Sequence, residues 1–446
     1  MRSRAVVVGA SMAGLLTARV LSDHVDEVDV FERDALPTDA IPRRGVPQGR
    51  HAHALLAAGK DLIETRFPGI VDEMVADGAV IGDGGDGIWW QAGALKVRAD
   101  IGITAVCMSR PAIENAVRRR LESISNVCVH TAAKVDGLAV EDDAVVGIRA
   151  AGEQIHADLV VDTSGRNSRL LADLANHGFP AADESVVRAG IGYATRILTR
   201  RPGDLDAMYA IIAATPPFEN RAGALLPIED ERWIVTLGGY HGDIATNDDD
   251  DGFLAFARSL PHPSIARVIE RAEPLSPVMT HRFQASQRRH FDQLDRLPRG
   301  FVALGDVVCS FNPIYGEGMS SAALQAEALG RVMTRHGPGT PRMAKAFYKK
   351  AARVVDVPWK IAVGSDFLHP LTTGPKPLGT DMVNRYVGLV QRASHVSPAV
   401  LTRLQEVQNL LAPPRALMSP AMVARVLATQ RRSPAVLRPV PETVAV

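Results

Sequence analysis

Cysteine is scarce in this sequence, with three residues among 446. Cys107, Cys128 and Cys309 lie far apart in the chain, and none of them belongs to a CxxC pair. The sequence therefore supports neither a disulfide framework nor a cysteine-ligated zinc site. So few cysteines suit a reducing compartment, and we expect a cytoplasmic protein.

An excess of charge of one sign is also missing, because 50 Lys and Arg residues balance 50 Asp and Glu residues. Nucleic-acid binding requires a positively charged surface, so we expect no nucleic-acid partner. No apolar run is long enough to span a bilayer, and we expect no membrane span. The run Ala5–Leu16, preceded by Arg2 and Arg4, is similar in composition to a signal peptide. It lacks a clear cleavage site, and a strand, turn and helix explain more of it.

Strand and helix patterns alternate at the start of the chain. The apolar run Ala5–Val8 is typical of a buried parallel strand, and a turn at Gly9–Gly14 leads into a helix at Leu15–Ser22. A second strand at Val28–Glu32 completes a β-α-β unit. A buried strand returns at Gly300–Gly305.

The rest of the chain changes character twice. Residues 185–285 are rich in strand patterns, and the chain after about residue 340 is helical, with many prolines and a loose tail expected at Arg431–Val446. Four further elements are expected: a helix at His51–Gly59, a helix at Arg110–Leu121, a strand at Val127–Val135, and paired strands at Ala144–Ala150 and Gln154–Asp162.

The first turn has the spacing of a dinucleotide-binding turn with one departure. Gly9 would make the tight turn, and Gly14 would allow the helix to pack closely on the strand. Ser11 stands where the middle glycine is usual, and its hydroxyl could donate to a phosphate. The amides that open the helix, at Met12 and Ala13, would point toward a pyrophosphate.

Two acidic residues follow buried strands. Glu32 closes the second strand, where an acid typically accepts hydrogen bonds from a ribose 2′-hydroxyl. Asp306 follows the strand Phe301–Leu304, and its position suits a second ribose or a ribityl hydroxyl. We therefore predict that both carboxylates bind sugar hydroxyls of one cofactor.

A glycine-rich segment opens the long helix Gly318–Arg335. Pro313, Gly316 and Gly318 precede or begin this helix. The free amides near Gly318, Met319 and Ser320, together with the helix dipole, would favour negative charge at the N1–C2 edge of a bound flavin. The alternative is that Gly318 only adopts a strained turn conformation.

These motifs together resemble group A flavoprotein monooxygenases, which have the aromatic-hydroxylase fold. The resemblance rests on the first turn, on Glu32, and on the pattern GD, six residues, P, two residues, GxG from residue 305 to 318. The segments 43–53 and 309–316 are similar to squalene-epoxidase-related enzymes and to bacterial epoxidases of polyether polyketide pathways. The resemblance covers about residues 4–335. It implies an FAD cofactor.

The resemblance also implies further contacts with FAD. Arg110 matches an arginine that contacts the pyrophosphate, and Val135, expected to end a strand, matches a position whose backbone meets adenine. Arg33 and Arg43 match flanking contacts to the ADP half. Two other arginines of the same loop, at 44 and 50, fit almost as well as Arg43.

One departure concerns the source of electrons. The family often carries an Asp-Gly motif linked to both FAD and NAD(P)H, and Ser164 stands here in place of its aspartate. Direct reduction by NAD(P)H is therefore in doubt, and a separate flavin reductase is the expected partner.

The resemblance implies an α/β fold with a discontinuous, Rossmann-type FAD-binding domain, an inserted β-sheet substrate domain and a helical C-terminal region. The FAD-binding domain would comprise residues 1–75, 106–184 and 286–345. The substrate domain would comprise a segment at 76–105 and a β-rich part at 185–285, and the C-terminal region with its loose tail would comprise 346–446.

The expected chemistry is that of a monooxygenase. Reduced FAD would form a C4a-hydroperoxide with O₂, and this would epoxidise or hydroxylate a hydrophobic polyketide or polyene substrate. Such chemistry needs no metal and no catalytic triad; neither is visible, and no catalytic residue is assigned. Two alternatives are an FAD-dependent [4+2] cyclase of polyketide biosynthesis, without redox chemistry, and a flavin dehydrogenase or reductase.

Isolated histidine and tryptophan residues give weaker signals. His51 and His53 could lie near a flavin, but we interpret them as hydrogen-bonded histidines of a loop or helix. The pair Trp89 and Trp90 is interpreted as core rather than as a platform for substrate.

Overall fold

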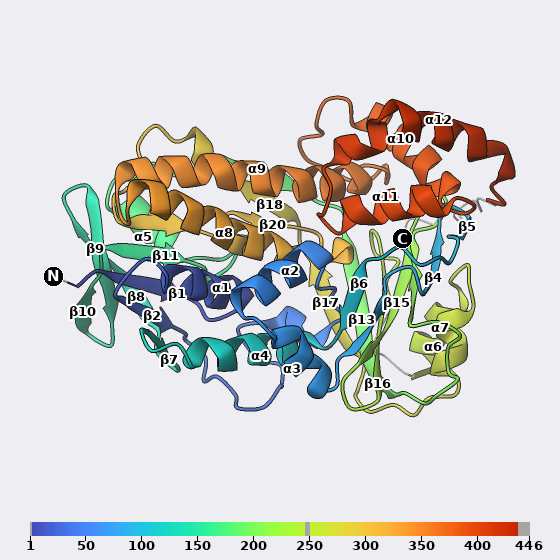
Figure 1. The fold of residues 1–446 in the computed structure, drawn as a ribbon, viewed down its shortest axis with the longest axis horizontal. Coiled ribbons are helices and arrows are strands. Elements are labelled where there is room, and N and C mark those ends of the chain that lie inside the picture. Colours follow the sequence, from blue (N-terminus) through green and yellow to red (C-terminus); the bar gives the residue numbers. More distant parts are fainter. Residues whose placement is uncertain (1, 246–249, 436–446) are drawn as a thin grey trace.

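The computed structural model describes residues 2–245 and 250–435. Its centre is a five-stranded parallel sheet with the strand order β19-β11-β1-β2-β7 (Figure 1). The strands are β1 (Arg4–Val8), β2 (Glu27–Phe31), β7 (Val127–His130), β11 (Leu159–Asp162) and β19 (Phe301–Ala303). Segments far apart in the sequence therefore meet at the carboxyl edge of one sheet, where ligands bind in such folds.

The apolar run of β1 explains its central position. Its residues Ala5 to Val8 are at most 7% exposed, as expected for a strand covered on both faces. Helix α1 (Met12–Leu21) follows directly and packs against α8 (Gly318–His336). The first helix of the chain and the helix after Gly316 thus lie side by side near the same sheet (Figure 1).

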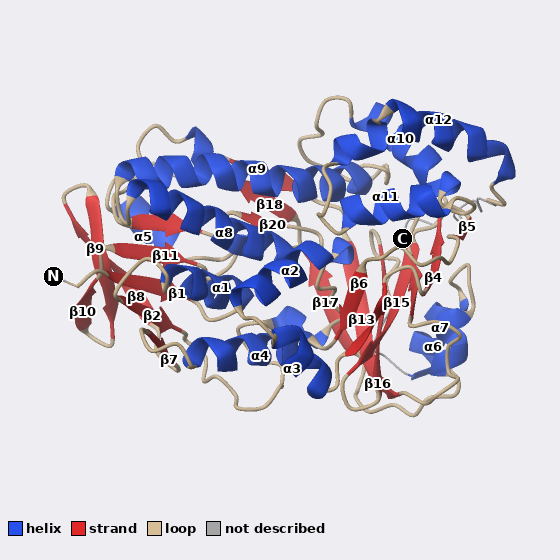
Figure 2. Cartoon of the chain, viewed as in Figure 1, coloured by secondary structure: helices blue, strands red, loops and turns tan. Residues whose placement is uncertain are grey.

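A second, seven-stranded sheet has the order β17-β13-β16-β15-β14-β4-β5 and is mainly antiparallel (Figure 2). The strand β4 joins it in parallel with β14, although the two are far apart in the sequence. Its strands are β4 (Gly87–Gln91), β5 (Ala94–Leu95), β13 (Ile191–Thr199), β14 (Tyr209–Ile212), β15 (Arg221–Ile228), β16 (Arg232–Gly239) and β17 (Met279–Phe283). A separate apolar core lies between this sheet and the helices α6 (Asp250–Arg258) and α7 (Ser264–Ile269).

The remaining strands form three small sheets. They are formed by β8 (Val135–Glu141), β9 (Ala144–Ala150) and β10 (Glu153–His156), by β12 (Glu184–Val187), β18 (Ser286–Arg289) and β20 (Cys309–Ser310), and by β3 (Val80–Asp83) with β6 (Thr104–Cys107). The remaining helices are α2 (Ala57–Arg66), α3 (Ile70–Ala76), α4 (Arg110–Glu122), α5 (Leu170–Asn176), α6 (Asp250–Arg258), α7 (Ser264–Ile269), α9 (Pro341–Asp366), α10 (Thr380–Ala393), α11 (Pro398–Gln408) and α12 (Pro420–Thr429).

The α/β fold with a parallel sheet and a helical C-terminal region is confirmed, but three expected elements differ. The strand expected at Val127–Val135 ends at His130, because the amides of Ala132 and Ala133 turn to the carbonyls of Asp34 and Glu32. Val135 instead opens β8.

The other two differences also have tertiary causes. The segment expected at Gln154–Asp162 is two strands in two sheets. The helix expected from His51 begins only at Ala57, because the side chain of His51 and the amide of Ala52 bond to threonines of the seven-stranded sheet. The loose tail expected at Arg431–Val446 lies mostly outside the described residues.

Within residues 2–245 and 250–435, no helix combines the length and apolar character that crossing a membrane requires.

Candidate functional site

The turn between β1 and α1 requires glycine at both of its ends. Gly9 has a φ of +104°, which side chains of L residues rarely adopt. A Cβ on Gly14 would lie 1.7 Å from the carbonyl oxygen of Gly9 and 2.9 Å from Thr163 Oγ1. The helix therefore begins directly against the sheet edge.

Ser11 and Arg110 connect the start of α1 to the start of α4. Arg110 donates a 2.9 Å hydrogen bond to Ser11 Oγ, and Ser11 in turn donates a 3.1 Å hydrogen bond to Glu114. Burial lowers the pKa of Arg110, although Glu114 and Asp306 oppose that effect. Its buried Nε has no hydrogen-bond partner among the described residues. A buried cation with an unfilled donor points to an acceptor that the chain itself does not supply.

Arg43 occupies the middle of an acidic cluster. Its guanidinium lies 3.0 Å from Glu32, 3.3 Å from Asp34 and 3.0 Å from Glu114. Burial alone would lower the pKa of Arg43, but Glu114 and Glu32 outweigh it and raise the pKa. Of the three candidate arginines in this loop, Arg43 is therefore the one that the fold directs inward, whereas those at 44 and 50 are exposed.

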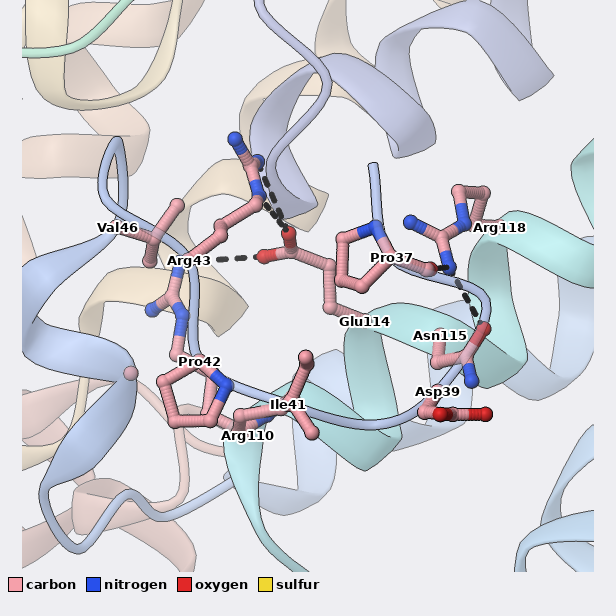
Figure 3. Close-up of a pocket in the computed structure, with 12 residues that line it drawn as sticks. Pro37, Asp39, Ile41, Pro42, Arg43, Val46, Arg110, Glu114, Asn115 and Arg118 are labelled. Atoms are coloured by element: carbon pink, nitrogen blue, oxygen red, sulfur yellow. Dashed lines mark hydrogen bonds and ion pairs between the residues drawn. The ribbon is translucent and has the colours of Figure 1, made fainter. Parts of the chain in front are cut away.

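A hollow lies between the loop of residues 37–49 and α4. Arg43, Arg110 and Glu114 line it together with apolar residues of the loop (Figure 3). The sequence did not reveal the role of Glu114, because a glutamate inside a helix is ordinary. Its spacing of four residues after Arg110 was the available signal, since such residues share one helix face.

Glu32 is buried and accepts hydrogen bonds from the amides of Ala10 and Asp34, at 2.9 and 3.0 Å. These bonds fix the carboxylate beside the turn, as its expected position requires. Arg33, by contrast, is exposed. Val135 lies at the start of β8, while Ala132 and Ala133 provide the backbone that contacts the segment after β2.

Asp306 lies in the turn after β19, between two arginines. Its side chain is exposed, yet burial by surrounding atoms raises its pKa, and Arg110 and Arg166 counteract that rise. Gly305 in the same turn has a φ of +69° and approaches Ala13, so this turn and the start of α1 border the same region.

The start of α8 presents backbone rather than side chains. Met319 and Ser320 are buried, so the helix turns its side chains inward. Gly316 has a φ of +68°, and a Cβ on it would lie 2.9 Å from Ala54 Cβ. Gly318 differs, because it has no left-handed φ and a Cβ on it would meet no atom within 4 Å. The chain therefore leaves space beside Gly318 next to amides that lack intrahelical partners. Pro313 begins the short 3-10 turn (Pro313–Tyr315) before this point.

Ser164, which stands where the family motif has an aspartate, is hydrogen-bonded within its own turn. Its hydroxyl donates a 2.6 Å hydrogen bond to Asp162, which is fully buried and also accepts from the hydroxyl of Ser168. Burial raises the pKa of Asp162. The aspartate of this segment thus holds the turn together and is not exposed at the sheet edge.

The loop around His51 contacts an aromatic wall formed by the seven-stranded sheet. His51 Nδ1 lies 2.7 Å from Thr195 Oγ1, and its ring packs on Tyr193 at 4.7 Å and on His281 at 5.7 Å. Burial lowers the pKa of His51 to about 4 and that of His53 to about 3, so both rings are neutral at pH 7. Both histidines are hydrogen-bonded, as expected. Nothing in the sequence indicated that Tyr193 and His281 would lie beside them.

The comparisons with known proteins agree on the fold. Residues 97–188 match the family model described as tryptophan halogenase. The flavin-dependent brominase Bmp2 superposes with a TM-score of 0.67 at 14% identity, covering 96% of this chain and 99% of its own. The p-nitrophenol 4-monooxygenase PnpA of Pseudomonas putida superposes with a TM-score of 0.66 at 18% identity, covering 91% and 99%. The expected resemblance to flavoprotein monooxygenases is confirmed for the fold, while the closer similarity to squalene-epoxidase-related enzymes stays a prediction.

A nearer relative establishes the family. Protein Rv3254 of Mycobacterium tuberculosis is 32% identical over 394 residues, which cover 84% of this chain and 83% of that protein. The chain therefore belongs to the family of Protein Rv3254, and it has the fold of FAD-dependent monooxygenases and flavin-dependent halogenases.

Proposed function

We propose that this protein is an FAD-dependent monooxygenase that epoxidises or hydroxylates a hydrophobic substrate of the polyketide or polyene class. The observation that carries the cofactor assignment is the buried guanidinium of Arg110, which lies beside Ser11 and has an unfilled donor. A pyrophosphate at the start of α1 would supply both the missing acceptor and the negative charge.

The other candidate residues fit different parts of FAD. Glu32 has lone pairs left after its two backbone bonds and would accept from the adenosine ribose. Asp306 would accept from the ribityl chain. The amides at Gly318 and Met319 would face the pyrimidine edge, where the space beside Gly318 admits a ring. Arg33 and Val135 remain proposed contacts of the ADP half.

Bound FAD would supply the activation of O₂, and the chain would supply orientation and shielding from water. The aromatic wall favours a hydrophobic substrate, because Tyr193 and Phe283 of the sheet cluster with Tyr240, which directly follows β16, beside the loop of His51. Aromatic rings bind planar or apolar groups without requiring charge. This wall supports an organic substrate but does not select between epoxidation and hydroxylation.

A separate flavin reductase is the proposed source of electrons. The carboxylate nearest to the Ser164 position belongs to Asp162, and two serine hydroxyls already occupy it. NAD(P)H would then act indirectly, by reducing flavin on the partner protein. We propose a location in the cytoplasm, where such reductases and NAD(P)H are present.

Halogenation is the second candidate, and the match of residues 97–188 to the tryptophan halogenase family supports it. One experiment separates the candidates. The protein is loaded with FAD, reduced under anaerobic conditions and mixed with O₂, with and without bromide, while H₂O₂ release and flavin reoxidation are followed.

A delay between oxygen uptake and H₂O₂ release, unaffected by bromide, supports oxygen transfer. Bromination of an activated diketone supports halogenation. Immediate release of H₂O₂ in step with reoxidation contradicts both and favours a dehydrogenase. A flavin that resists reduction favours the cyclase. Incorporation of ¹⁸O from labelled O₂ into a polyene test substrate would then identify the oxygen transfer directly.

A further inference from the structure

Lys96 carries a buried amine without a polar partner. The residue directly follows β5 and is 4% exposed. Among the described residues, its Nζ has no hydrogen-bond partner. The amine lies over the ring of Trp89, 3.8 Å from the ring centroid. The face of an aromatic ring attracts a cation but does not replace hydrogen-bond acceptors, so the donors of the ammonium group stay unfilled.

Two neighbouring side chains also have unfilled polar atoms. Trp89 Nε1 and Gln91 Oε1 are buried atoms without a hydrogen-bond partner in the described part of the chain. Trp89 and Gln91 lie two residues apart on β4, so their side chains point to one face of the sheet. Lys96 shares this face, because its amide donates to the carbonyl of Trp89 and continues the pairing of β4 with β5. Two donors and one acceptor therefore lie unfilled at one corner of the seven-stranded sheet.

This corner lies on the sheet face that the loop of His51 contacts. Trp90 packs on the opposite face, against the apolar core beside α6 and α7. From the corner, a row of directly paired residues crosses four successive strands, and its members are Trp89, Ile211, Ala224 and Thr236. The hydroxyl of Thr236 accepts from the amide of Ala52 in the loop of His51. The cross-strand row thus connects Lys96 to the loop beside the aromatic wall.

The cross-strand row is only half-buried, in contrast to the other face of the same strands. Its four residues are all of intermediate exposure. Ala210, Ile212 and Leu225, which point to the other face, are fully buried. With neighbouring strands about 4.8 Å apart, the distance along the sheet from Thr236 to Lys96 is roughly 19 Å. The row therefore provides a long, mainly apolar floor that solvent can reach.

The C-terminal region closes the end of this floor at Lys96. The amide of Val97 donates to the carbonyl of Ser394 at 3.0 Å, and His395 Nε2 lies 2.8 Å from the carbonyl oxygen of Gln91. Ser394 and His395 directly follow α10, which lies over β4 and β5 (Figure 1). We therefore expect a ligand to approach Lys96 along the cross-strand row, from the side of the His51 loop.

An anion would complete the environment of Lys96. Burial lowers the pKa of Lys96 to about 7, so the protonated amine is present at neutral pH without a counter-ion. A carboxylate in contact with the amine would supply both an acceptor and the opposite charge. The side chains of Ile211 and Ala224 would contact a hydrocarbon chain attached to that carboxylate.

We propose that Lys96 anchors the carboxylate of an elongated apolar acid, whose chain lies along the cross-strand row toward the loop of His51. The inference rests on the proposed function, since this acid is taken to be the hydrophobic substrate. Lys96 then determines specificity and positions the chain, while the opposite end of the chain lies at the aromatic wall.

Binding of cis-parinaric acid, a fluorescent polyene fatty acid, tests the anchor without catalysis. Wild type, with and without FAD, should bind the acid roughly 10- to 150-fold more tightly than its methyl ester, as expected for one charged hydrogen bond. Lys96→Met should weaken binding of the acid by a similar factor and leave binding of the ester unchanged. Lys345→Met, at an exposed lysine, is the matched control and should bind both probes as wild type does.

Three results overturn the anchor: no saturable binding of the acid, equal affinity of wild type for acid and ester, or wild-type affinity for the acid in Lys96→Met. If Lys96→Met fails to fold, the comparison of acid with ester in the wild type still decides.

Displacement of the probe by saturated fatty acids of increasing length tests the position of the chain. The affinity of wild type should rise by up to about fourfold for each added CH₂ and should level off once the chain reaches the His51 loop. Ala224→Phe should make the affinity level off at a shorter chain, because the ring fills the row. Affinity that does not depend on chain length, or an unchanged series in a folded Ala224→Phe variant, overturns this placement.

These outcomes remain distinguishable from those of the proposed function, because binding is measured without electrons or O₂. Loss of ¹⁸O incorporation with acid-selective binding intact would contradict oxygen transfer but not the anchor. If oxygen transfer to a polyene acid occurs, Lys96→Met should raise the KM for the acid far more than it lowers kcat. An unchanged KM would contradict the anchor alone.

Discussion

The guanidinium of Arg110 donates a 2.9 Å hydrogen bond to the hydroxyl of Ser11. This contact joins the start of α4 to the start of α1, two segments almost one hundred residues apart in the sequence. The serine that departs from the usual glycine is therefore part of the arginine's environment. Its hydroxyl accepts from Arg110 and donates to Glu114, and a glycine at this position would provide neither hydrogen bond.

Replacement of Arg110 should separate cofactor binding from stability. Arg110→Met removes a buried cation whose pKa burial already lowers, so the apoprotein should be as stable as wild type or slightly more stable. FAD affinity should fall by roughly 10- to 150-fold, which corresponds to the ~1.5–3 kcal/mol of a charged hydrogen bond. Quenching of FAD fluorescence measures the affinity. The exposed Arg44→Ala is the matched control, and equal FAD affinity in both variants would contradict the pyrophosphate assignment.

The two glycines before and within α8 should behave differently. Gly318→Val should leave the melting temperature of the apoprotein nearly unchanged, since a side chain there meets no protein atom within 4 Å. It should abolish FAD binding by filling the space beside the amides. Gly316→Val should instead lower the melting temperature of the apoprotein, because its φ is +68° and Ala54 blocks the side chain. Wild-type FAD affinity in a folded Gly318→Val variant would refute the role of this glycine.

The local motifs were predictable because their spacing reflects backbone geometry. The need for glycine at positions 9 and 14 was predictable, because a strand turns sharply into a helix there. The structure confirms that side chains at Gly9 and Gly14 would collide with the backbone. The position of Asp306 was predictable because it comes just after a buried strand. Such signals lie within a few residues of one another, so the sequence displays them directly.

The long-range partners were not predictable in the same way. Asp366 bonds to Asn312 across 54 residues, and Tyr240 approaches Tyr315 across 75. Neither pair has a spacing that a helix or strand would impose. The helix predicted from His51 was wrong for the same reason. Its first residues bond to Thr195 and Thr236, which belong to a sheet distant in the sequence. Tertiary contacts decided these features, and local propensity does not contain them.

Glu32 should contribute to both folding and binding. Glu32→Ala leaves the buried amide of Ala10 and the partly buried amide of Asp34 without their acceptor, which typically costs about 1–3 kcal/mol for a buried unsatisfied group. We expect a lower free energy of unfolding of the apoprotein and weaker FAD binding. Glu32→Gln keeps one acceptor oxygen and should recover part of the stability. Denaturant unfolding of the apoproteins measures the first effect, and an unchanged midpoint for Glu32→Ala would be inconsistent with these bonds.

Restoring an aspartate at position 164 should harm the turn. Ser164→Asp replaces the hydroxyl that donates to Asp162 with a second carboxylate, which would lie against the first. We expect a loss of thermal stability and no gain in the rate at which NADPH bleaches the flavin. In wild type, NADPH alone should bleach it slowly, and an added flavin reductase should accelerate the reaction. Rapid bleaching of wild type by NADPH alone would remove the need for a partner reductase.

The buried carboxyl of Asp366 should make stability depend on pH in a defined direction. Its pKa in the folded protein is raised to about 7 by burial, against ~3.9 for an ordinary aspartate in the unfolded chain. Between these values the folded state binds more protons, so this group's contribution to stability is complete below pH ~4 and is lost as the pH rises through 7. The total change is on the order of 4 kcal/mol. Other buried carboxyls act in the same direction, so the difference between wild type and Asp366→Asn isolates this one. Denaturant unfolding from pH 4 to 8 should show the variant gaining stability relative to wild type up to about pH 7 and a constant difference above it. Parallel curves over the whole range would mean that Asp366 is ionised in the folded protein and that its second oxygen has a partner.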